Sequence, residues 1–387
     1  MSSRWLRWMP AAAMPVVVAA VVLAGPLAAL APGALPAKTP EQIVAMVAGS
    51  EVRALSGTLE ETVDLGLPQL PGVGPGSSSD PGTASAGMDL WLGLLTAPHT
   101  VRLYLDGATN QRVQVLNTLA EQDLVRHGNS VWSYDSPTNT ASHLTLPPAP
   151  AVPYASPPKM PGYVGPDTLP LATNPPADPT PGSPVATPAQ LAATFLANID
   201  PSTQVSTGPA TRVAGRDAYQ LVLTPRTAGT LVGEVRIAVD AATGLPLSVS
   251  VQAKGADAAA FTVAFGTLEL AAPLASTFLF TPPPGATVTE VSRPASTPPA
   301  MPLPGTLSAT PAGPTISGNG WATILVAPAG TVPTTLLDSP ALAQLLHTVP
   351  GGHALETSLF TALVTTDGHL YTGAVPLSAL QAAAAGR

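Results

Sequence analysis

The sequence contains no cysteine and few charged or aromatic side chains. The absence of cysteine excludes a disulfide, a thiolate metal site, a cysteine nucleophile and a lipid-modified cysteine behind a leader. Charged residues make up 10% of the 387 residues, against about a quarter in an average globular protein. The formal net charge is −8, which argues against a nucleic-acid partner because nucleic acids are bound by basic surfaces.

Proline and small residues take the place of the missing charges. The 47 prolines predict a β-rich body with long irregular connections, because proline ends helices and is excluded from central strands. The stretches at residues 147–188 and 292–314 are especially rich in proline. We interpret the first as an insert and the second as a linker between domains.

The first 37 residues have the features of a secretory leader. Arg4 and Arg7 form a basic start, and an apolar run rich in Ala, Val and Leu follows over Met9–Ala31. The run is also just long enough to span a bilayer, although prolines interrupt it. Residues 1–37 therefore predict a cleaved signal peptide or a retained N-terminal membrane anchor, and both place the body outside the cytoplasm.

Two short amphipathic helices are predicted from the same local sequence pattern. At Thr39 and again at Thr187, a threonine precedes a proline, and a glutamine stands three residues after the threonine. Threonine can cap the helix, proline suits its first position, and glutamine completes a capping box. The first helix is expected to run to about Val52. Both must bury an apolar stripe on another element.

A long antiparallel meander is predicted to provide that element. Its expected strands have alternating or β-branched residues and are separated by turn sequences such as Gly128-Asn129. They are Ser56–Leu65, Thr100–Asp106, Arg112–Leu119, Gln122–His127, Val131–Tyr134, Ser142–Leu146, Thr211–Val213, Ala218–Thr224, Leu231–Val239, Leu247–Ala253, Phe261–Leu270 and Thr277–Thr281.

The alternation gives this sheet one apolar face. The residues that alternate onto it are Leu103, Val113, Val115, Trp132, Tyr134, Tyr219, Leu221, Leu223, Val235, Ile237, Phe261, Val263 and Phe265. Such a face is ordinarily core. Because only two short helices are available to cover a broad sheet, part of the face could instead line a cavity.

An apolar cluster precedes the second predicted strand. It consists of Met88, Leu90, Trp91, Leu92, Leu94 and Leu95, with Asp89 as its one charge. Two interpretations remain open: a short helix packed in the core, or a lid that covers a ligand or touches a membrane.

The C-terminal residues 315–387 predict a small βαββα module. A strand is expected over Gly320–Ala327, a helix over Pro340–His347, a hairpin formed by Ser358–Thr366 and Leu370–Val375, and a final helix over Leu377–Ala385. The module could pack on the main sheet rather than fold alone.

The sequence offers no catalytic or metal-binding motif. It has no G-x-S-x-G elbow, no glycine-rich phosphate loop after a strand and no H-E-x-x-H. His353 and Glu356 have a spacing suited to metal ligation only on a helix, and the glycines before them favour a solvated loop. We therefore expect no enzyme, no metal and no cofactor.

Three ordered motifs between Thr211 and Val291 resemble proteins of the LolA type. Residues 213–225, which contain Tyr219-Gln220-Leu221, resemble that family's strand ending in Y-x-L-x-P. Residues 239–247, with Asp240 and Thr243-Gly244-Leu245-Pro246, are similar to its D-x-x-T-G-L-P hairpin. Phe278 to Ala286 look like its closing F-x-F-x-P-P-x-G strand.

The resemblance, to the LolA-like and MucB/RseB-like superfamily as an exported actinobacterial-type member, implies an α+β fold. That fold is a large curved antiparallel sheet, a half-open, incomplete β-barrel, covered by short helices. It would occupy residues 38–291, followed by the linker 292–314. The apolar face then becomes the candidate wall of a hollow for acyl chains. The family's lid-latching arginine has no evident counterpart here.

Two functional hypotheses follow from the resemblance. The first is an extracytoplasmic, non-enzymatic carrier, chaperone or sensor that binds lipid or lipoprotein acyl chains at the cytoplasmic-membrane surface. The second is an RseB-like regulator that binds a membrane anti-sigma factor, for which the C-terminal module would be a reason. A purely structural envelope protein is a third hypothesis, but it does not explain why the sheet has one apolar face.

Overall fold

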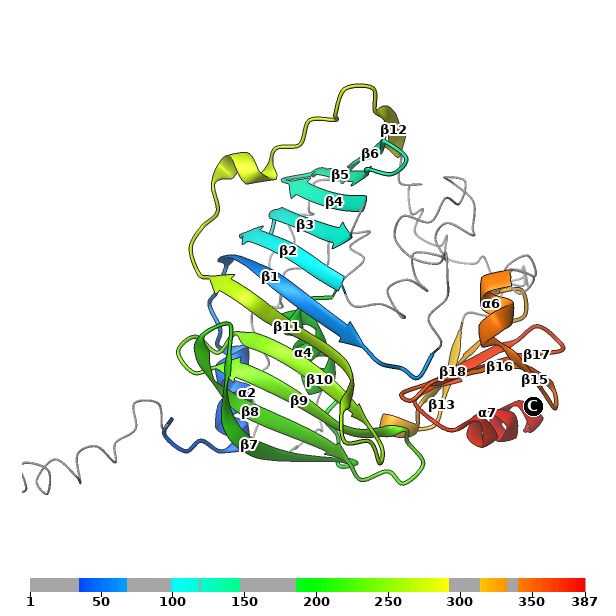
Figure 1. Ribbon diagram of the computed structural model, residues 1–387. Helices are drawn as coiled ribbons and strands as arrows, with labels where there is room; N and C mark the ends of the chain where they lie inside the picture. Colours follow the sequence, from blue (N-terminus) through cyan, green and yellow to red (C-terminus); the bar gives the residue numbers. More distant parts are fainter. Residues whose placement is uncertain are drawn as a thin grey trace, which may run out of the picture. The chain divides into compact units, whose positions relative to one another are not determined.

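The computed structural model describes residues 35–67, 99–117, 120–146, 186–291, 314–332 and 340–386. In these ranges the chain forms two β-sheets and several short helices, all within a compact unit that begins at Thr39 (Figure 1). The predicted leader, residues 1–37, and the predicted insert, residues 147–188, lie almost wholly outside the described residues.

The larger sheet has 12 strands in the order β12-β6-β5-β4-β3-β2-β1-β11-β10-β9-β8-β7. All neighbours are antiparallel except β6 and β12, which run parallel. The sheet does not close, since β12 and β7 form its two edges. Its strands are β1 (Ala54–Val63), β2 (His99–Asp106), β3 (Asn110–Asn117), β4 (Ala120–His127), β5 (Ser130–Asp135), β6 (Thr140–Thr145), β7 (Thr203–Val213), β8 (Arg216–Pro225), β9 (Val232–Asp240), β10 (Pro246–Ala253), β11 (Ala259–Glu269) and β12 (Thr287–Val291).

Local turn chemistry explains how successive strands pair. Between β7 and β8 the two loop residues, Ala214 and Gly215, have φ angles of 49° and 75°. Two consecutive positive φ angles are the requirement of the tight turn whose twist matches an antiparallel pair. Gly128, between β4 and β5, also has a positive φ, of 60°. The meander predicted from the sequence is confirmed in both halves of the sheet.

The smaller sheet has six strands in the order β13-β14-β18-β17-β16-β15. They are β13 (Thr315–Ser317), β14 (Ile324–Ala327), β15 (His347–Val349), β16 (Gly352–Glu356), β17 (Thr361–Thr365) and β18 (Leu370–Gly373), with helices α6 (Pro340–Leu345) and α7 (Leu377–Ala385). Helix α7 packs on β17 and β18, and a separate core forms around Leu363, Tyr371 and Leu380. A small C-terminal α+β module is therefore present, with three more strands than predicted.

Two capped helices cover the second half of the larger sheet. Helix α2 (Pro40–Ala48) packs on β7 and β8, and helix α4 (Pro188–Ala197) packs on β10 and β11 (Figure 1). Both capping boxes are formed as predicted: the threonine hydroxyl accepts from the backbone of the glutamine, whose side chain accepts from the threonine N–H. Helix α2 ends at Ala48, one turn before the expected Val52, because the chain turns at Gly49 into the loop before β1.

The predicted strand over Thr277–Thr281 is wrong. The chain instead forms a short 3-10 helix, η2 (Ala275–Phe278), which packs on β3 and β4, and then runs irregularly to β12. The three prolines 282–284 have no N–H to give to a ladder, and Phe278 is buried. The strand predicted over Gly320–Ala327 likewise begins later, after a 3-10 turn at Gly320–Ala322.

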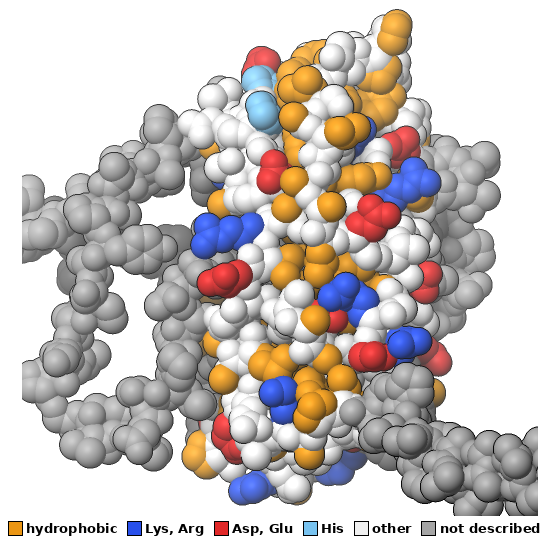
Figure 2. Space-filling view, turned by 90° about the vertical axis from the view of Figure 1, so that its left-hand side faces the viewer, with side chains coloured by type: hydrophobic (Ala, Val, Ile, Leu, Met, Phe, Trp, Pro, Cys, Tyr) orange, Lys and Arg blue, Asp and Glu red, His pale blue; other side chains and the backbone are white. Residues whose placement is uncertain are grey.

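The predicted fold class is otherwise confirmed: a large, mostly antiparallel open sheet with few helices and a smaller second sheet. Within the described ranges, no helix has both the length and the apolar character needed to span a membrane. Figure 2 shows the side of the molecule that lies at the left of Figure 1, with hydrophobic side chains gathered near its upper end. The exposed leucines that flank η2 are Leu274, 78% exposed, and Leu279, 63% exposed.

Candidate functional site

We call the inner face the face of the larger sheet that carries Leu59, Leu103 and Phe265. Leu59 of β1 lies opposite Val101 of β2 and, on its other side, opposite Phe265 of β11. Leu103, two residues after Val101, lies opposite Val113 of β3. Because directly opposite residues and residues two apart share a face, the inner face is continuous from β3 through β1 to β11.

Trp132 and Tyr134 are not on this face. Val113 lies opposite Leu124 of β4, whereas Trp132 lies opposite the next residue, Val125. Trp132 and Tyr134 therefore point to the other side, which we call the outer face, and cannot share a hollow with Leu103. The grouping made from the sequence is corrected here: alternation fixes the faces within one strand but not the phase between two strands.

The outer face carries an aromatic and polar cluster of its own. The Trp132 ring stacks on His143 at 4.3 Å and lies 5.4 Å from Phe280. His143 Nε2 is 2.8 Å from the hydroxyl of Ser130, and its Nδ1 is 3.0 Å from the Glu290 carboxylate. This Ser–His–Glu sequence of contacts links β12 to β5 and β6. None of these three residues lines either cavity described below. We therefore interpret the contacts as structural, holding the edge strand β12 on β6.

A charged pair fastens η2 to the same face. Arg112 donates to both carboxylate oxygens of Asp123, at 3.1 and 2.6 Å, and to the carbonyl of Thr277 at 3.1 Å. Burial raises the pKa of Asp123 above its ordinary value, although the hydrogen bonds and charge of Arg112 act in the opposite direction.

In the second half of the larger sheet, strands β7 to β11, packed side chains fill the space over the inner face. Helices α2 and α4 lie over it, and five of the candidate residues have no exposed surface: Leu221, Leu223, Val235, Ile237 and Val263. Tyr219 is also buried. At these positions the alternation marks core. In the first half Val113 and Val115 are buried too, and the free space lies next to Leu103 and Phe265.

A first cavity of about 280 Å³ opens on the inner face at β1, β2 and the start of α4. Leu55, Leu103, Leu105 and Phe265 contribute its apolar floor, and all belong to strands of the larger sheet. The other lining residues are Ser50, Glu51, Val52, Arg53, Gly107, Ala108, Gln111, Thr187, Ala189, Gln190 and Leu245. Polar and charged side chains thus border an apolar interior.

The N-terminal turn of α4 supplies one wall. Thr187 and Gln190, which both line the cavity, are also the two partners of the capping box, with reciprocal bonds of 2.9 and 3.3 Å. Ala189, between them, packs on the core of the larger sheet that contains Leu55, Leu103 and Phe265. The local sequence that starts the helix therefore also fixes the side chains that face the cavity.

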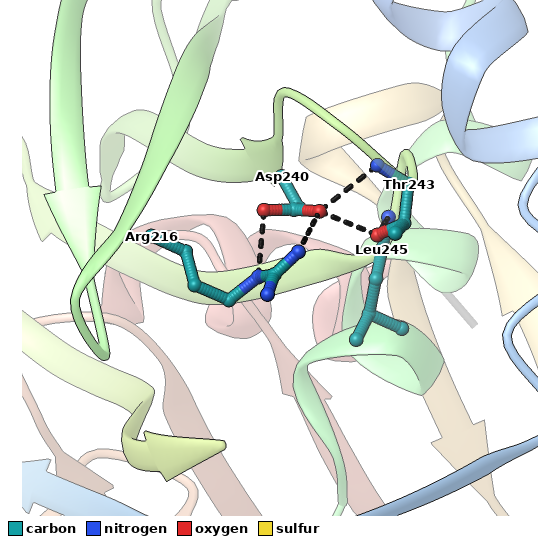
Figure 3. Close-up of polar contacts among 4 residues, drawn as sticks. All are labelled: Arg216, Asp240, Thr243 and Leu245. Atoms are coloured by element: carbon teal, nitrogen blue, oxygen red, sulfur yellow. Dashed lines mark hydrogen bonds and ion pairs between the residues drawn. The ribbon is translucent and has the colours of Figure 1, made fainter. Parts of the chain in front are cut away.

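The wall residue Leu245 is held by a buried ion pair in the β9–β10 turn (Figure 3). Arg216 donates to both oxygens of Asp240, at 2.9 and 2.8 Å. The N–H and hydroxyl of Thr243 donate to Asp240 Oδ2 at 2.9 and 2.6 Å. The Leu245 N–H in turn donates to the Thr243 hydroxyl at 3.4 Å. The D-x-x-T-G-L-P motif thus has a structural role.

Burial of Asp240 opposes its ionisation, but the hydrogen bonds from Arg216 and Thr243 outweigh this, so the pKa of Asp240 lies below its ordinary value. The bond to Asp240 is also the main cause that raises the pKa of Arg216. The pair is therefore charged at neutral pH, and its geometry satisfies both charges inside the fold.

Gly244, the glycine of this motif, is required for a different reason from Asp240 and Thr243. Gly244 has a φ of 73°, and a Cβ placed on it would lie 2.1 Å from the carbonyl oxygen of Met46 in α2. A side chain at this position would therefore push helix α2 off the turn.

Sequence reasoning missed most of the cavity. Leu105 shares a face with Leu103 and could have been found by alternation. Leu245 lay within a recognised motif and Leu55 directly precedes the predicted strand Ser56–Leu65, but nothing local indicated that they meet α4, which begins more than a hundred residues after β1. The candidate lid Met88, Leu90, Trp91, Leu92, Leu94 and Leu95 lies outside the described residues. In the described part of the chain no cluster of metal-ligating side chains occurs.

No family model and no curated protein matches the chain. Among solved structures it is similar to MucB of Pseudomonas aeruginosa in complex with MucA, with 17% identity over 89% of this chain and 96% of that chain and a TM-score of 0.39. It is also similar to an uncharacterised conserved protein of Thermus thermophilus, with 11% identity over 65% of this chain and 98% of that one and a TM-score of 0.32.

A LolA-superfamily protein of Nitrosomonas europaea is similar as well, with 10% identity over 63% of this chain and 99% of that chain and a TM-score of 0.22. The solved structures thus include the two kinds of protein, MucB and LolA, that the sequence motifs resemble. With identities and TM-scores this low, the likeness carries nothing about function.

Proposed function

We propose that the protein is an extracytoplasmic, non-enzymatic binding protein that holds an acyl chain of a lipid or lipoprotein in the first cavity. The observation that carries this proposal is the division of the cavity wall into an apolar floor, formed by Leu55, Leu103, Leu105 and Phe265, and a polar border. A ligand with a hydrocarbon tail and a polar head matches both parts.

The energetics favour such a ligand. Each buried methylene contributes about 0.8 kcal/mol, so roughly six of them would supply about 5 kcal/mol without any hydrogen bond. The cavity volume of about 280 Å³ is close to the lower end of small-molecule sites, about 300 Å³. It therefore fits part of one chain rather than a whole lipid. The remainder would extend to the border.

The border offers a place for the head group. Arg53 and Glu51, both exposed, lie on the loop between α2 and β1 that forms one side of the cavity. The Arg53 guanidinium has the geometry to pair with a carboxylate or phosphate. Glu51 beside it disfavours a second anionic group, which favours a head of single negative charge.

The remaining parts of the proposal rest on the sequence. The leader-like residues 1–37 support a place outside the cytoplasm, and the missing catalytic motifs support a binding role. Binding of an anti-sigma factor, the alternative function, has no contact or surface among the described residues that favours it over acyl-chain binding.

The test fills the cavity from α4. Ala189→Leu would extend three additional carbon atoms toward the cavity, whereas Ala197→Leu makes the same change at an exposed position of the same helix. We expect the full chain and Ala197→Leu to bind a fluorescent fatty acid, and Ala189→Leu to bind it about tenfold more weakly, since displacing about two methylenes loses that factor. No uptake by the parent chain, together with no lipid in its organic extract, would sink the proposal.

A further inference from the structure

A second cavity, of about 430 Å³, lies where the C-terminal module meets the larger sheet. From the larger sheet and its covering helix come Leu191, Phe195 and Phe261, and from the module come Trp321, Leu359 and Ala374. Val232, Val251, Gly320 and Thr323 complete the lining. Neither sheet could form this cavity without the other.

Hydrogen bonds around the cavity hold its two sides together. The N–H of Leu231 and the hydroxyl of Thr230, next to β9, both donate to the carbonyl of Ala374, at 2.8 and 2.9 Å. Elsewhere, the N–H of Ser358 donates to the carbonyl of Leu65 at 3.0 Å. The module is thus joined to the larger sheet through residues that flank β1 and β9.

Trp321 joins the two parts at the cavity itself. Its indole Nε1 donates to the hydroxyl of Thr203 in β7 at 2.8 Å, and its ring stacks on Phe195 of α4 at 6.2 Å. The indole therefore presents its ring, rather than its N–H, to the interior.

The chemistry of the lining points to hydrocarbon. None of the lining residues is charged, and the two with side-chain donors have already used them: Trp321 on Thr203, and Thr323 on the carbonyl of Gly320 at 2.7 Å. A polar ligand would lose its bonds to water here and gain none in return. A peptide would meet the same cost along its backbone, whereas an alkyl chain has nothing to satisfy.

We propose that this second cavity binds one alkyl chain of a fatty acid or lipid, with the C-terminal module as one wall. Its volume falls within the range of about 300–1,000 Å³ that is usual for small-molecule sites. The inference goes beyond the proposed function, because its site is built from different residues. It also gives the module a use in a binding protein, since removing the module would remove half of the site.

The test uses Trp321 as a reporter. In the full chain the other tryptophans, Trp5, Trp8, Trp91 and Trp132, are replaced by phenylalanine. Stearic acid that carries bromine atoms in mid-chain is then added, because bromine quenches tryptophan fluorescence only at close range. We expect saturable quenching of Trp321.

Filling variants assign the quenching to one cavity. Ala374→Leu, or Leu359→Phe if the first variant fails to fold by circular dichroism, should weaken the quenching affinity by about tenfold or more, as the loss of about two methylenes requires. Ala189→Leu, which fills the first cavity, should leave it unchanged.

Uptake of fatty acid without quenching of Trp321 would overturn the second site and leave the proposed function intact. Quenching that Ala189→Leu abolishes and Ala374→Leu spares would also overturn it, because the chain would then reach Trp321 from the first cavity. Absence of any uptake would remove both proposals. An apolar peptide that displaces stearate from the parent chain but does not bind to Ala374→Leu would identify a protein ligand for this cavity. That result would overturn the assignment to an alkyl chain.

Discussion

Arg216, the first residue of β8, and Asp240, the last residue of β9, form a two-point ion pair, with the Asp240 side chain only 2% exposed. A second pair, between Arg212 of β7 and Asp217 of β8, spans the β7–β8 turn with an aspartate that is 40% exposed. The two pairs have similar chemistry and differ in burial. They therefore separate the contribution of a buried pair from that of a surface pair.

Replacing Asp240 with alanine should destabilise the fold by about 3–5 kcal/mol, because Arg216 is left without its partner in a partly buried position. The corresponding Asp217→Ala should change the free energy of unfolding by about 1 kcal/mol or less, as is usual for exposed pairs. Urea unfolding of both variants measures the difference. Equal effects would show that the β9–β10 turn does not depend on the pair.

The pH dependence of the Asp240 contribution follows from its lowered pKa. A carboxylate with a depressed pKa in the folded state stabilises the fold above its unfolded pKa, about 3.9, and loses that contribution as the pH falls through the folded value. The stability difference between the parent and Asp240→Asn should thus be constant above about pH 5 and shrink below about pH 4.

Asp123 provides the opposite case. Because burial raises its pKa, the parent should lose stability relative to Asp123→Asn as the pH rises through the ordinary range of an aspartate. Urea titrations at several pH values test both signs, and parallel slopes for the two variants would contradict the assigned causes.

Gly244 and Gly255 form a matched pair of turn glycines. Both have positive φ angles, 73° and 79°, but a Cβ at Gly255 would meet nothing within 4 Å. Gly255→Ala should therefore cost only the backbone conformation, about 1–2 kcal/mol. Gly244→Ala should cost clearly more, because the added carbon displaces the end of α2. Thermal unfolding of the two variants measures the difference in stability. Similar midpoints would rule out a tight contact between Gly244 and α2.

Ser130 tests the non-enzymatic assignment most directly. Its hydroxyl contacts His143, which in turn contacts Glu290, and this is the connectivity of a hydrolase triad. We expect no labelling of Ser130 by a fluorophosphonate, because its hydroxyl lines neither cavity. Specific labelling that disappears in Ser130→Ala would reveal an active nucleophile and overturn the assignment.

Leu274 and Leu279 test the predicted membrane-surface partner. Insertion of an exposed leucine into a bilayer surface gains about 1.5 kcal/mol or more, so each change to aspartate should weaken vesicle binding by about tenfold or more. Ile316→Asp, at another exposed apolar side chain, is the control. Co-sedimentation with phosphatidylcholine vesicles measures the effect. Equal binding by all variants would exclude the leucines as a contact.

The sequence predicted best what is decided locally. The capping boxes at Thr39 and Thr187 and the turn at Gly128-Asn129 depend on neighbours within three residues, and all formed as expected. The face of Trp132 depends on the register between β4 and β5, which alternation along one strand does not contain.

The first cavity is harder to predict for a related reason. Leu55, Ala189 and Leu245 come from three separated parts of the chain, and only their packing brings them together. Leu221 and Ile237 show the converse, since their alternation was recognised but did not reveal that helices would fill the space above them. A hydrophobic pattern predicts which side chains are buried. It does not predict whether they pack against other side chains or line a cavity.

The place of β1 in the larger sheet has a consequence for how the chain folds. β1 pairs with β2 and with β11, so that Ser56 meets Glu269, and the side of β6 that faces away from β5 is paired only by β12. Such distant pairings close large loops and slow folding relative to the local hairpins. Until the chain has been synthesised as far as Val291, β6 remains an open strand edge, the kind of surface on which chains aggregate. The chain is therefore most prone to aggregate before its synthesis has passed β12.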